Sequence, residues 1–206
     1  MKIIELYGFS ASGKSYNAKK IATKYKLDLN FLKISKRIRL IRLFNKLFYI
    51  FNLKMNDLRF IAKIHKFFKF NGILRRVKSI FSYMYVIGFI RHYKKKKQSI
   101  IIDHGLFQCL FGSFLYMPKN MISDIRIAFL FTEYLKILFK NSDYKIIEMK
   151  TNLKIIKKRL IKDKNYQKLK FINKNKNKNK IIDTYFRISF ILENYIKINL
   201  AEIYSK

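Results

Sequence analysis

A glycine-bearing motif near the amino end constrains the fold of this chain more than any other feature. The letters GFSASGKS occupy residues 8–15 and follow a short apolar run, residues 2–7, that contains β-branched residues and predicts a buried strand. From Lys14 onward, apolar residues recur at helical spacing. The sequence therefore predicts a strand, a tight loop and a helix in direct succession.

The spacing G-x-x-x-x-G-K-[ST] is typical of a loop that binds phosphate groups. Backbone N–H groups can wrap a phosphate chain only where no side chain obstructs them, which favours glycine at both ends of the loop. The loop leads to a helix N-terminus, where free amides and the helix dipole favour negative charge. Lys14 then reaches the β and γ phosphates of a nucleotide, and the Ser15 hydroxyl ligates Mg²⁺. The expected cofactor-binding residues here are Gly8, Ser10, Ala11, Ser12, Gly13, Lys14, Ser15 and Tyr16.

A carboxylate follows a second predicted strand. The letters SIIID at residues 99–103 form an unbroken apolar strand that ends in Asp103. Ligands bind at the carboxyl edge of open α/β sheets, so we expect Asp103 to be a catalytic residue and, with Ser15, a metal ligand. The alternative is a helix cap. His104 stands where hydrolytic enzymes with this loop commonly have Glu. The His in this place favours phosphoryl transfer over hydrolysis. The alternative is that His104 is a solvated imidazole without a role.

The rest of the chain alternates further strands with helices, which implies a parallel sheet. Helical periodicity dominates residues 34–91, with breaks near Asn56 and Gly72 that predict three helices packed in the core through their apolar stripes. We also predict a strand at 145–149 and a weaker one at 27–34. No convincing strand follows the last helix. Helices are expected at 106–116, at 120–140, from about 151 and from 182 to the end.

These elements predict a single α/β domain over residues 1–206, with three layers and a parallel sheet of four or five strands. A large helical insertion is expected at residues 35–97. Residues 162–180 are rich in lysine, and 173–180 alternate Asn and Lys, so this segment is expected to be a mobile basic loop.

The charge of the chain admits two explanations. Lys and Arg number 46 against 12 Asp and Glu, a formal charge of +34. Such a value is typical of proteins that bind nucleic acid or an acidic surface. However, Lys, Ile and Asn all have codons poor in G and C, and Lys far outnumbers the Arg that phosphate recognition usually favours. We expect base composition to be the main cause and retain polyanion binding as the alternative.

Several classes of protein are excluded by simple counts. Cys109 is the only cysteine, so no intramolecular disulfide or cysteine-rich zinc site can form. The longest uncharged stretch, 105–118, is too short for a bilayer, which needs about 20 residues. Glu5 interrupts the apolar start before it reaches the length of a signal peptide. We expect a cytoplasmic protein without a membrane span, and leave its oligomeric state open between monomer and homodimer.

Three stretches resemble the nucleotide- and nucleoside-kinase branch of the P-loop NTPases, and most closely the thymidylate-kinase-like proteins. They are IIELYGFSASGKS at 3–15, SIIIDHGLFQ at 99–108 and YKIIEMKTNLKIIKKRL at 144–160. Similar proteins occur among bacterial surface-polysaccharide genes. The resemblance implies the P-loop NTPase fold, ATP and Mg²⁺ as cofactors, and transfer of a phosphoryl group. The guanine signature N-K-x-D is absent from the sequence, which also makes adenine nucleotides the expected donor.

The resemblance also implies a lid over the nucleotide. Arg159 matches a lid arginine that contacts the donor phosphates in such kinases. The resemblance therefore implies that Arg159 is a catalytic residue and that the lysine-rich segment 162–180 is the lid. Arg187 is a second lid candidate. Asp163 stands where such kinases usually have another cation. The inserted helices would form the wall of the acceptor site. There an acceptor phosphate could be bound by Arg75, Arg76 and Arg91. The alternative is that these arginines are solvated cations.

The expected function is therefore that of an ATP-dependent small-molecule kinase. It would transfer the γ-phosphoryl group to a nucleotide, a nucleoside or a similar small acceptor. The alternatives are a P-loop ATPase or nucleotide-dependent switch that binds nucleic acid or another polyanion, and a protein that binds nucleotide without turnover.

Overall fold

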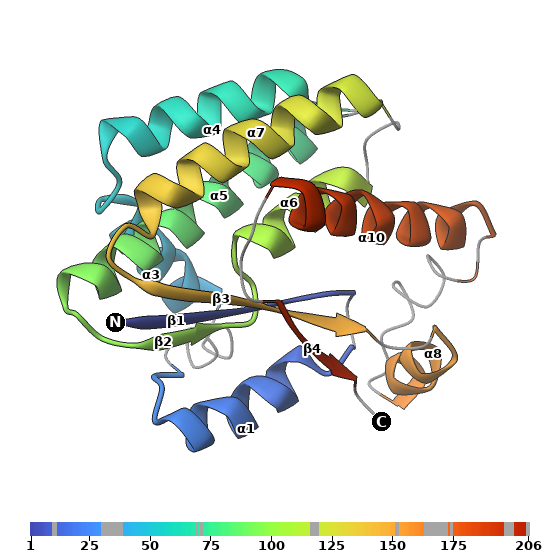
Figure 1. Ribbon diagram of the computed structural model, residues 1–206, viewed down its shortest axis with the longest axis horizontal. Helices are drawn as coiled ribbons and strands as arrows, with labels where there is room; N and C mark the ends of the chain where they lie inside the picture. The colour runs from blue at the N-terminus through green and yellow to red at the C-terminus, as the bar shows by residue number, and fades with distance from the viewer. Residues whose placement is uncertain are drawn as a thin grey trace.

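Parallel strands form the central sheet of this chain (Figure 1). The computed structural model describes residues 1–9, 12–29, 39–68, 70, 72–115, 120–150, 153–162, 173, 175–195 and 200–204. Within these residues the strands are β1 (Lys2–Tyr7), β2 (Ile100–Ile102), β3 (Asp143–Lys150) and β4 (Leu200–Tyr204). They form one 4-stranded sheet in the order β2-β1-β3-β4, and every neighbouring pair is parallel. The sheet thus has the lower of the two strand numbers that the sequence predicts.

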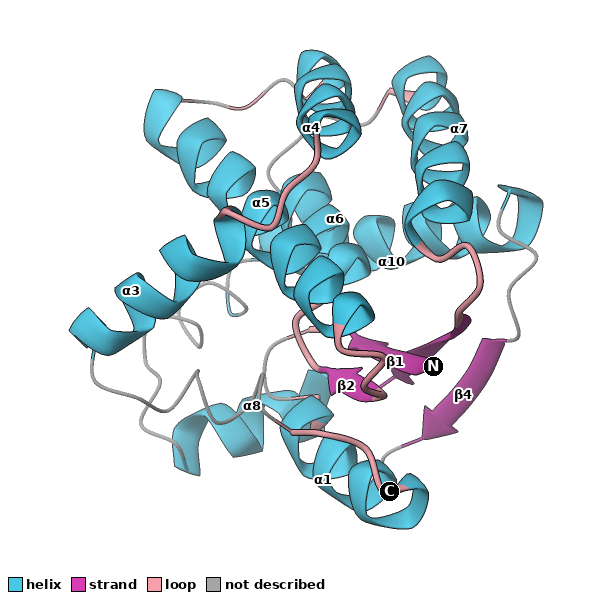
Figure 2. Cartoon of the chain, turned by 90° about the vertical axis from the view of Figure 1, so that its left-hand side faces the viewer, coloured by secondary structure: helices cyan, strands magenta, loops and turns pink. Residues whose placement is uncertain are grey.

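Helices cover both faces of this sheet (Figures 1 and 2). The described helices are α1 (Lys14–Tyr25), α3 (Arg39–Ile50), α4 (Met55–Phe67), α5 (Ile73–Lys95), α6 (Leu106–Leu115), α7 (Met121–Leu138), α8 (Leu153–Lys162) and α10 (Asn175–Tyr195). Side chains alternate across a strand. In β1, Ile4 and Leu6 therefore pack with α1 in one core, while Ile3 and Tyr7 pack with the larger helical layer in a second core. The predicted three layers follow from these two cores.

The two ends of the sheet differ from the sequence prediction. At one edge, the described part of the strand expected at 27–34, residues 27–29, forms a single bridge between Asp28 and Ile100, and residues 30–38 lie outside the described part of the chain. At the other edge, β4 pairs with β3 over five positions, from Ile146 with Leu200 to Lys150 with Tyr204. The expectation that no strand follows the last helix is wrong. In the sequence these residues continue the helical periodicity that starts at 182, so only their pairing with β3 identifies them as a strand.

The predicted helical insertion is present between α1 and β2 as α3, α4 and α5. Helices α3 and α5 approach so closely that a Cβ on Gly88 would lie 2.0 Å from the Tyr49 carbonyl oxygen. The expectation that the apolar stripes of these helices lie in the core is only partly correct. Ile61, Ile64 and Ile87 are buried, but Phe44 and Phe48 of α3 and the large apolar side chains in the first turns of α5 are exposed to solvent.

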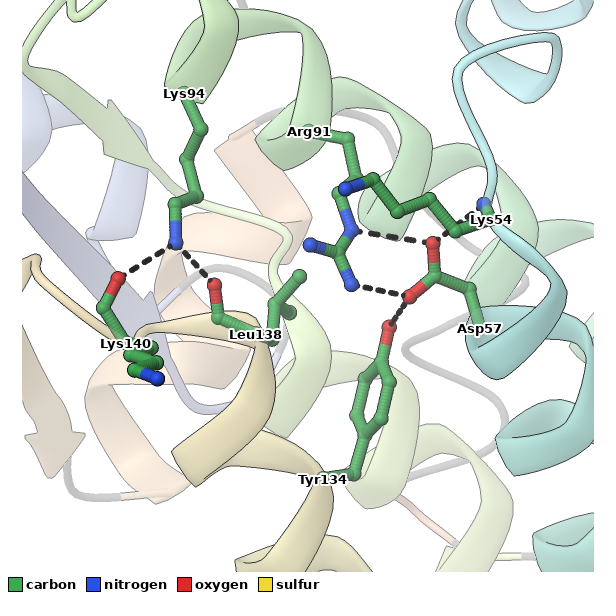
Figure 3. Close-up of polar contacts among 7 residues, drawn as sticks. All are labelled: Lys54, Asp57, Arg91, Lys94, Tyr134, Leu138 and Lys140. Carbon is green, nitrogen blue, oxygen red and sulfur yellow. Dashed lines mark hydrogen bonds and ion pairs between the residues drawn. The ribbon is translucent and has the colours of Figure 1, made fainter.

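Buried polar contacts tie the insertion to α7 (Figure 3). Asp57, at the start of α4, accepts hydrogen bonds from Arg91 Nε at 3.1 Å, Arg91 Nη2 at 2.7 Å and the Tyr134 hydroxyl at 2.7 Å. Lys94 Nζ donates to the carbonyl oxygens of Leu138 and Lys140 at the end of α7, over 2.5 and 3.1 Å. Lys94 therefore caps carbonyl groups at the C-terminal end of this helix.

The basic segment also differs from its prediction. Helix α10 begins at Asn175, inside the Asn-Lys tract that was expected to be mobile up to residue 180. Lysine is a good helix former, so the helix whose apolar residues start at Ile181 extends backwards into the tract. Residues 163–172, the greater part of the predicted lid, lie outside the described residues.

Candidate phosphate-binding site

The predicted loop lies at the point where the connections between strands change direction. From β1 the chain runs to β2 on one side, and from β3 it runs to β4 on the other side, although β1 and β3 are neighbours. In open α/β sheets this arrangement leaves a crevice at the carboxyl ends of the two neighbouring strands, where ligands bind. Gly8 follows β1 directly and faces the end of β3. A Cβ on Gly8 would stand 2.9 Å from the Met149 carbonyl oxygen.

Both motif glycines have backbone conformations that L side chains rarely adopt. The φ angle is 148° at Gly8 and 92° at Gly13. Gly13 is the N-cap of α1, and it supplies no side-chain cap to the first turn. That turn also contains no acidic residue. The start of α1 therefore has no side-chain cap, and it presents the positive end of the helix dipole to the crevice.

Lys14 folds back over the loop that it belongs to. Its Nζ donates hydrogen bonds to the carbonyl oxygens of Gly8, at 2.7 Å, and Phe9, at 2.9 Å. The side chain is buried, so its ammonium lies within the loop and not in bulk solvent. An arriving phosphate group would meet a cation that is already held at this position. Its charged oxygens are stronger hydrogen-bond acceptors than the two neutral carbonyls.

Ser15 and Asp103 meet, as the sequence predicts for two ligands of one metal ion. Ser15 Oγ donates to Asp103 Oδ2 over 2.7 Å. Asp103 Oδ1 is buried and, among the described residues, has no hydrogen-bond partner. A buried carboxylate oxygen without a donor is energetically costly and fits a cation ligand. No three His, Cys, Asp or Glu gather into a metal cluster in the described part of the chain. Mg²⁺ fits such a site because it commonly takes one or two protein ligands and completes its shell with water and phosphate oxygens.

Arg159 reaches the loop from the far side of the crevice. It lies on α8, the helix that follows β3, and a Cβ on Gly13 would stand 3.1 Å from its Nη1 atom. The guanidinium thus lies beside the start of α1, where the sequence places the donor phosphates. Its contact with donor phosphates, which the resemblance implies, stays a prediction.

Arg187 does not take the place that the resemblance suggests. It is buried on α10, and its guanidinium forms a two-pronged ion pair with Asp124 of α7, with Nε–Oδ2 at 2.7 Å and Nη2–Oδ1 at 2.5 Å. The guanidinium also lies 4.1 Å from the centre of the Phe114 ring. The expectation that Arg187 contacts the nucleotide is therefore corrected. A buried carboxylate has already paired with it, and the pair joins α10, α7 and α6.

The other predicted residues have simpler positions. Ser12 is buried, and its amide donates to the Phe9 carbonyl oxygen at 3.2 Å. The Tyr16 ring is exposed beneath Lys20 Nζ, which leaves its backbone amide in the first turn of α1 as its contribution to the site. Ser10 and Ala11 lie outside the described residues. Arg91 is paired with Asp57, so it is not a solvated cation.

Two residues that hold the loop were not identified from the sequence. The Gly8 amide donates to Gln108 Oε1 at 3.1 Å, and the Phe9 amide donates to the Tyr185 hydroxyl at 2.6 Å. Burial and the nearby Glu148 raise the pKa of Tyr185, so its hydroxyl stays protonated. Gln108 is the last residue of the stretch that resembles the kinases, but no local signal marks Tyr185, because it reaches the loop from 176 positions away.

Glu5 is a third such residue. It is fully buried in β1, and its carboxylate accepts hydrogen bonds from the amides of Phe107, at 2.5 Å, and Gln108, at 3.3 Å, at the start of α6. The Tyr144 hydroxyl donates to its other oxygen at 2.7 Å. Burial raises the pKa of Glu5 to about 7, against the opposing effect of these hydrogen bonds. Glu5 thereby orients the helix that carries Gln108 to the loop.

The chain was compared with known proteins. No protein-family model, no curated protein and no solved structure matches it. No helix in the described residues is long and apolar enough to cross a membrane.

Proposed function

We propose that this protein binds Mg²⁺-ATP at the Gly8–Ser15 loop and transfers the γ-phosphoryl group to a small acceptor that carries a hydroxyl or phosphate group. The observation that carries the proposal is the meeting of three elements at one crevice. These are the uncapped start of α1, the Ser15–Asp103 pair at 2.7 Å and the Arg159 guanidinium beside Gly13. Such a set of positive groups and oxygen ligands suits a triphosphate with its metal ion.

The chain's own groups would act by positioning and by neutralising charge. The Lys14 ammonium would leave the carbonyls of Gly8 and Phe9 and donate to phosphate oxygens, while the amides of the first turn of α1 hold the chain of phosphates in place. Arg159 would offset the negative charge that moves with the transferred group. Ser15 and Asp103 would hold Mg²⁺, which when bound neutralises phosphate charge.

Transfer is favoured over hydrolysis by the residue that follows Asp103. His104 is exposed and directly follows Asp103, in place of a carboxylate that would activate water. A bound acceptor would also exclude water from the crevice, which favours transfer to the acceptor. The P-loop NTPase fold class and the kinase activity are both part of this proposal.

Calorimetry with Mg²⁺-ATP tests the first half of the proposal. Wild-type protein should bind the nucleotide, Lys14→Ala should bind it at least about tenfold more weakly because a charge-assisted contact is lost, and Lys19→Ala should bind normally. Lys19 is the matched control because it is exposed on the same helix. Absence of binding to the wild-type protein would reject the proposal.

Labelled ATP tests the second half. A screen of nucleosides, nucleotides and sugars should find an acceptor that receives label from [γ-³²P]ATP, and Lys14→Ala should not transfer it. Release of phosphate at a rate independent of every acceptor would instead indicate an ATPase. If that release rose with DNA or RNA and fell steeply with salt, it would indicate a polyanion-dependent enzyme.

A further inference from the structure

From Phe44 onward, helix α3 and the residue that follows it expose large apolar side chains to solvent. Phe44, Leu47, Phe48 and Phe51 are 65, 41, 55 and 87% exposed. Their spacing of three and four residues places them on one side of the helix. Met55 and Leu58 extend this exposed surface to the start of α4. These six residues are named the α3 face below.

The opposite side of α3 is fixed to the rest of the protein. Tyr49 is buried, and its ring lies 5.0 Å from the Phe89 ring and 5.2 Å from the His92 ring of α5. Its backbone contacts Gly88 so closely that a side chain there has no room. A partner can therefore reach α3 from one side only. This geometry suits a broad surface and does not suit a groove that surrounds a helix.

The charges around the α3 face have one sign. Asp57 is the only acidic residue between Asp28 and Asp103, and every other charged residue in that stretch is Lys or Arg. Asp57 is fully buried and paired with Arg91, so it presents no negative charge at the surface. Lys46, Lys54 and Arg59 are exposed beside these residues in the chain, and the exposed Lys95 reaches Asn52, the neighbour of Phe51, with Nζ 3.5 Å from Oδ1.

We propose that the α3 face docks this protein on the surface of a membrane that contains anionic lipids. Apolar side chains in the middle of a basic surface can enter the boundary between headgroups and acyl chains while the cations contact the lipid headgroups. A second copy of this chain fits the face less well, because it would bring the same cations together in a protein of net charge +34. The proposal concerns a different surface from the phosphate-binding site and does not rest on the proposed function.

Vesicle flotation tests the docking. The full chain should float with phosphatidylcholine vesicles that contain about 30% phosphatidylglycerol and should not float with pure phosphatidylcholine. The double variant F44S/F51S should bind the anionic vesicles at least about tenfold more weakly, since two large apolar contacts are lost. The matched control is F129S/F186S, which removes two phenylalanines that are 60 and 71% exposed on α7 and α10, and it should bind as the wild type does.

Fluorescence provides a second readout, because the chain contains no tryptophan. Phe51→Trp should shift its emission to the blue and be quenched by brominated lipids when anionic vesicles are added, whereas Phe129→Trp should show neither change. Circular dichroism should show both serine variants folded, since the substituted side chains are exposed. Mg²⁺-ATP binding should be the same in F44S/F51S and the wild type, so this test succeeds or fails separately from that of the nucleotide site.

Three results would overturn the proposal. In the first, F44S/F51S binds anionic vesicles as strongly as the wild type, which would make net charge the whole cause. In the second, Phe51→Trp stays unquenched while the protein is bound to vesicles. In the third, sedimentation shows a wild-type dimer that F44S/F51S disrupts without any change in vesicle binding, which would assign the face to a second copy of the chain.

Discussion

The Ser15 hydroxyl donates a hydrogen bond to Asp103 Oδ2 at 2.7 Å, although 88 positions separate the two residues in the chain. The contact exists because β1 and β2 are parallel neighbours, with Glu5 opposite Ile102, so the residues that follow each strand meet at the same edge of the sheet. The second oxygen of Asp103 is buried without a partner among the described residues. Together the two side chains define where a magnesium ion fits the loop.

Replacing Asp103 with Asn tests this metal site. The amide oxygen can still accept from Ser15, but the negative charge that attracts Mg²⁺ is gone. We expect Mg²⁺ to strengthen ATP binding to the wild type and to have little effect on the variant, with phosphoryl transfer at least about a hundredfold slower. Calorimetry with and without Mg²⁺ measures the difference. Asp183→Asn, on the exposed side of α10, should keep the wild-type response to Mg²⁺.

Two arginines near the basic segment should respond in opposite ways. Arg159→Ala should slow phosphoryl transfer by about a hundredfold and leave the free energy of unfolding nearly unchanged, because this side chain lies at the loop and is only partly buried. Arg187→Ala should instead lower the free energy of unfolding by about 3–5 kcal/mol, because it leaves the buried Asp124 carboxylate unpaired.

Urea unfolding and initial rates separate the two effects. Lys158→Ala, exposed on the same helix as Arg159, is the control and should change neither quantity. A loss of transfer in fully folded Arg187→Ala, together with normal transfer in Arg159→Ala, would contradict the assignment of these two residues.

Tyr185→Phe tests how firmly the loop must be held. The variant removes the hydroxyl that accepts from the Phe9 amide at 2.6 Å. An unpaired buried amide costs about 1–3 kcal/mol, so stability should fall within this range, and ATP should bind several-fold more weakly because part of the loop's order is lost. Tyr16→Phe changes a hydroxyl on an exposed ring beside the loop and should affect neither stability nor ATP affinity.

Glu5→Gln should change how stability depends on pH. Burial raises the pKa of Glu5 from 4.5 to about 7 in the folded protein, so between these values the folded state holds a proton that the unfolded state has released. Wild-type stability from this group is therefore highest below pH 4.5, falls as the pH rises, and levels off above about pH 7. Over that range the fall amounts to about 3 kcal/mol.

The measurement compares two proteins across the same pH range. The free energy of unfolding of Glu5→Gln minus that of the wild type should rise by about 3 kcal/mol from pH 4.5 to pH 7.5, since glutamine does not titrate. Glu133→Gln, at an exposed position on α7, should show no such rise. A flat difference for Glu5→Gln would mean that Glu5 ionises as readily in the fold as in the unfolded chain.

The amino-acid sequence determined the parts of this protein that depend on residues close together in the chain. The strand, glycine loop and helix at residues 2–25, the strand before Asp103 and three inserted helices could all be predicted, because backbone conformation and side-chain spacing are local properties. The motif also predicted that Lys14 and Ser15 would share a site with Asp103, since residues that follow parallel strands lie at one edge.

Only the tertiary structure decided what depends on distant partners. Periodicity shows that Phe44, Phe48 and Phe51 share one face of a helix, but it does not show that this face points outward, because burial depends on which element packs against it. For the same reason, the sequence alone does not distinguish the positions of Arg159 and Arg187. Arg187 pairs with the buried carboxylate of Asp124 and not with the loop. Strand β4 and the hydrogen bond between the Phe9 amide and the Tyr185 hydroxyl also depend on distant partners. Both arise from pairing across the fold and leave no local pattern in the chain.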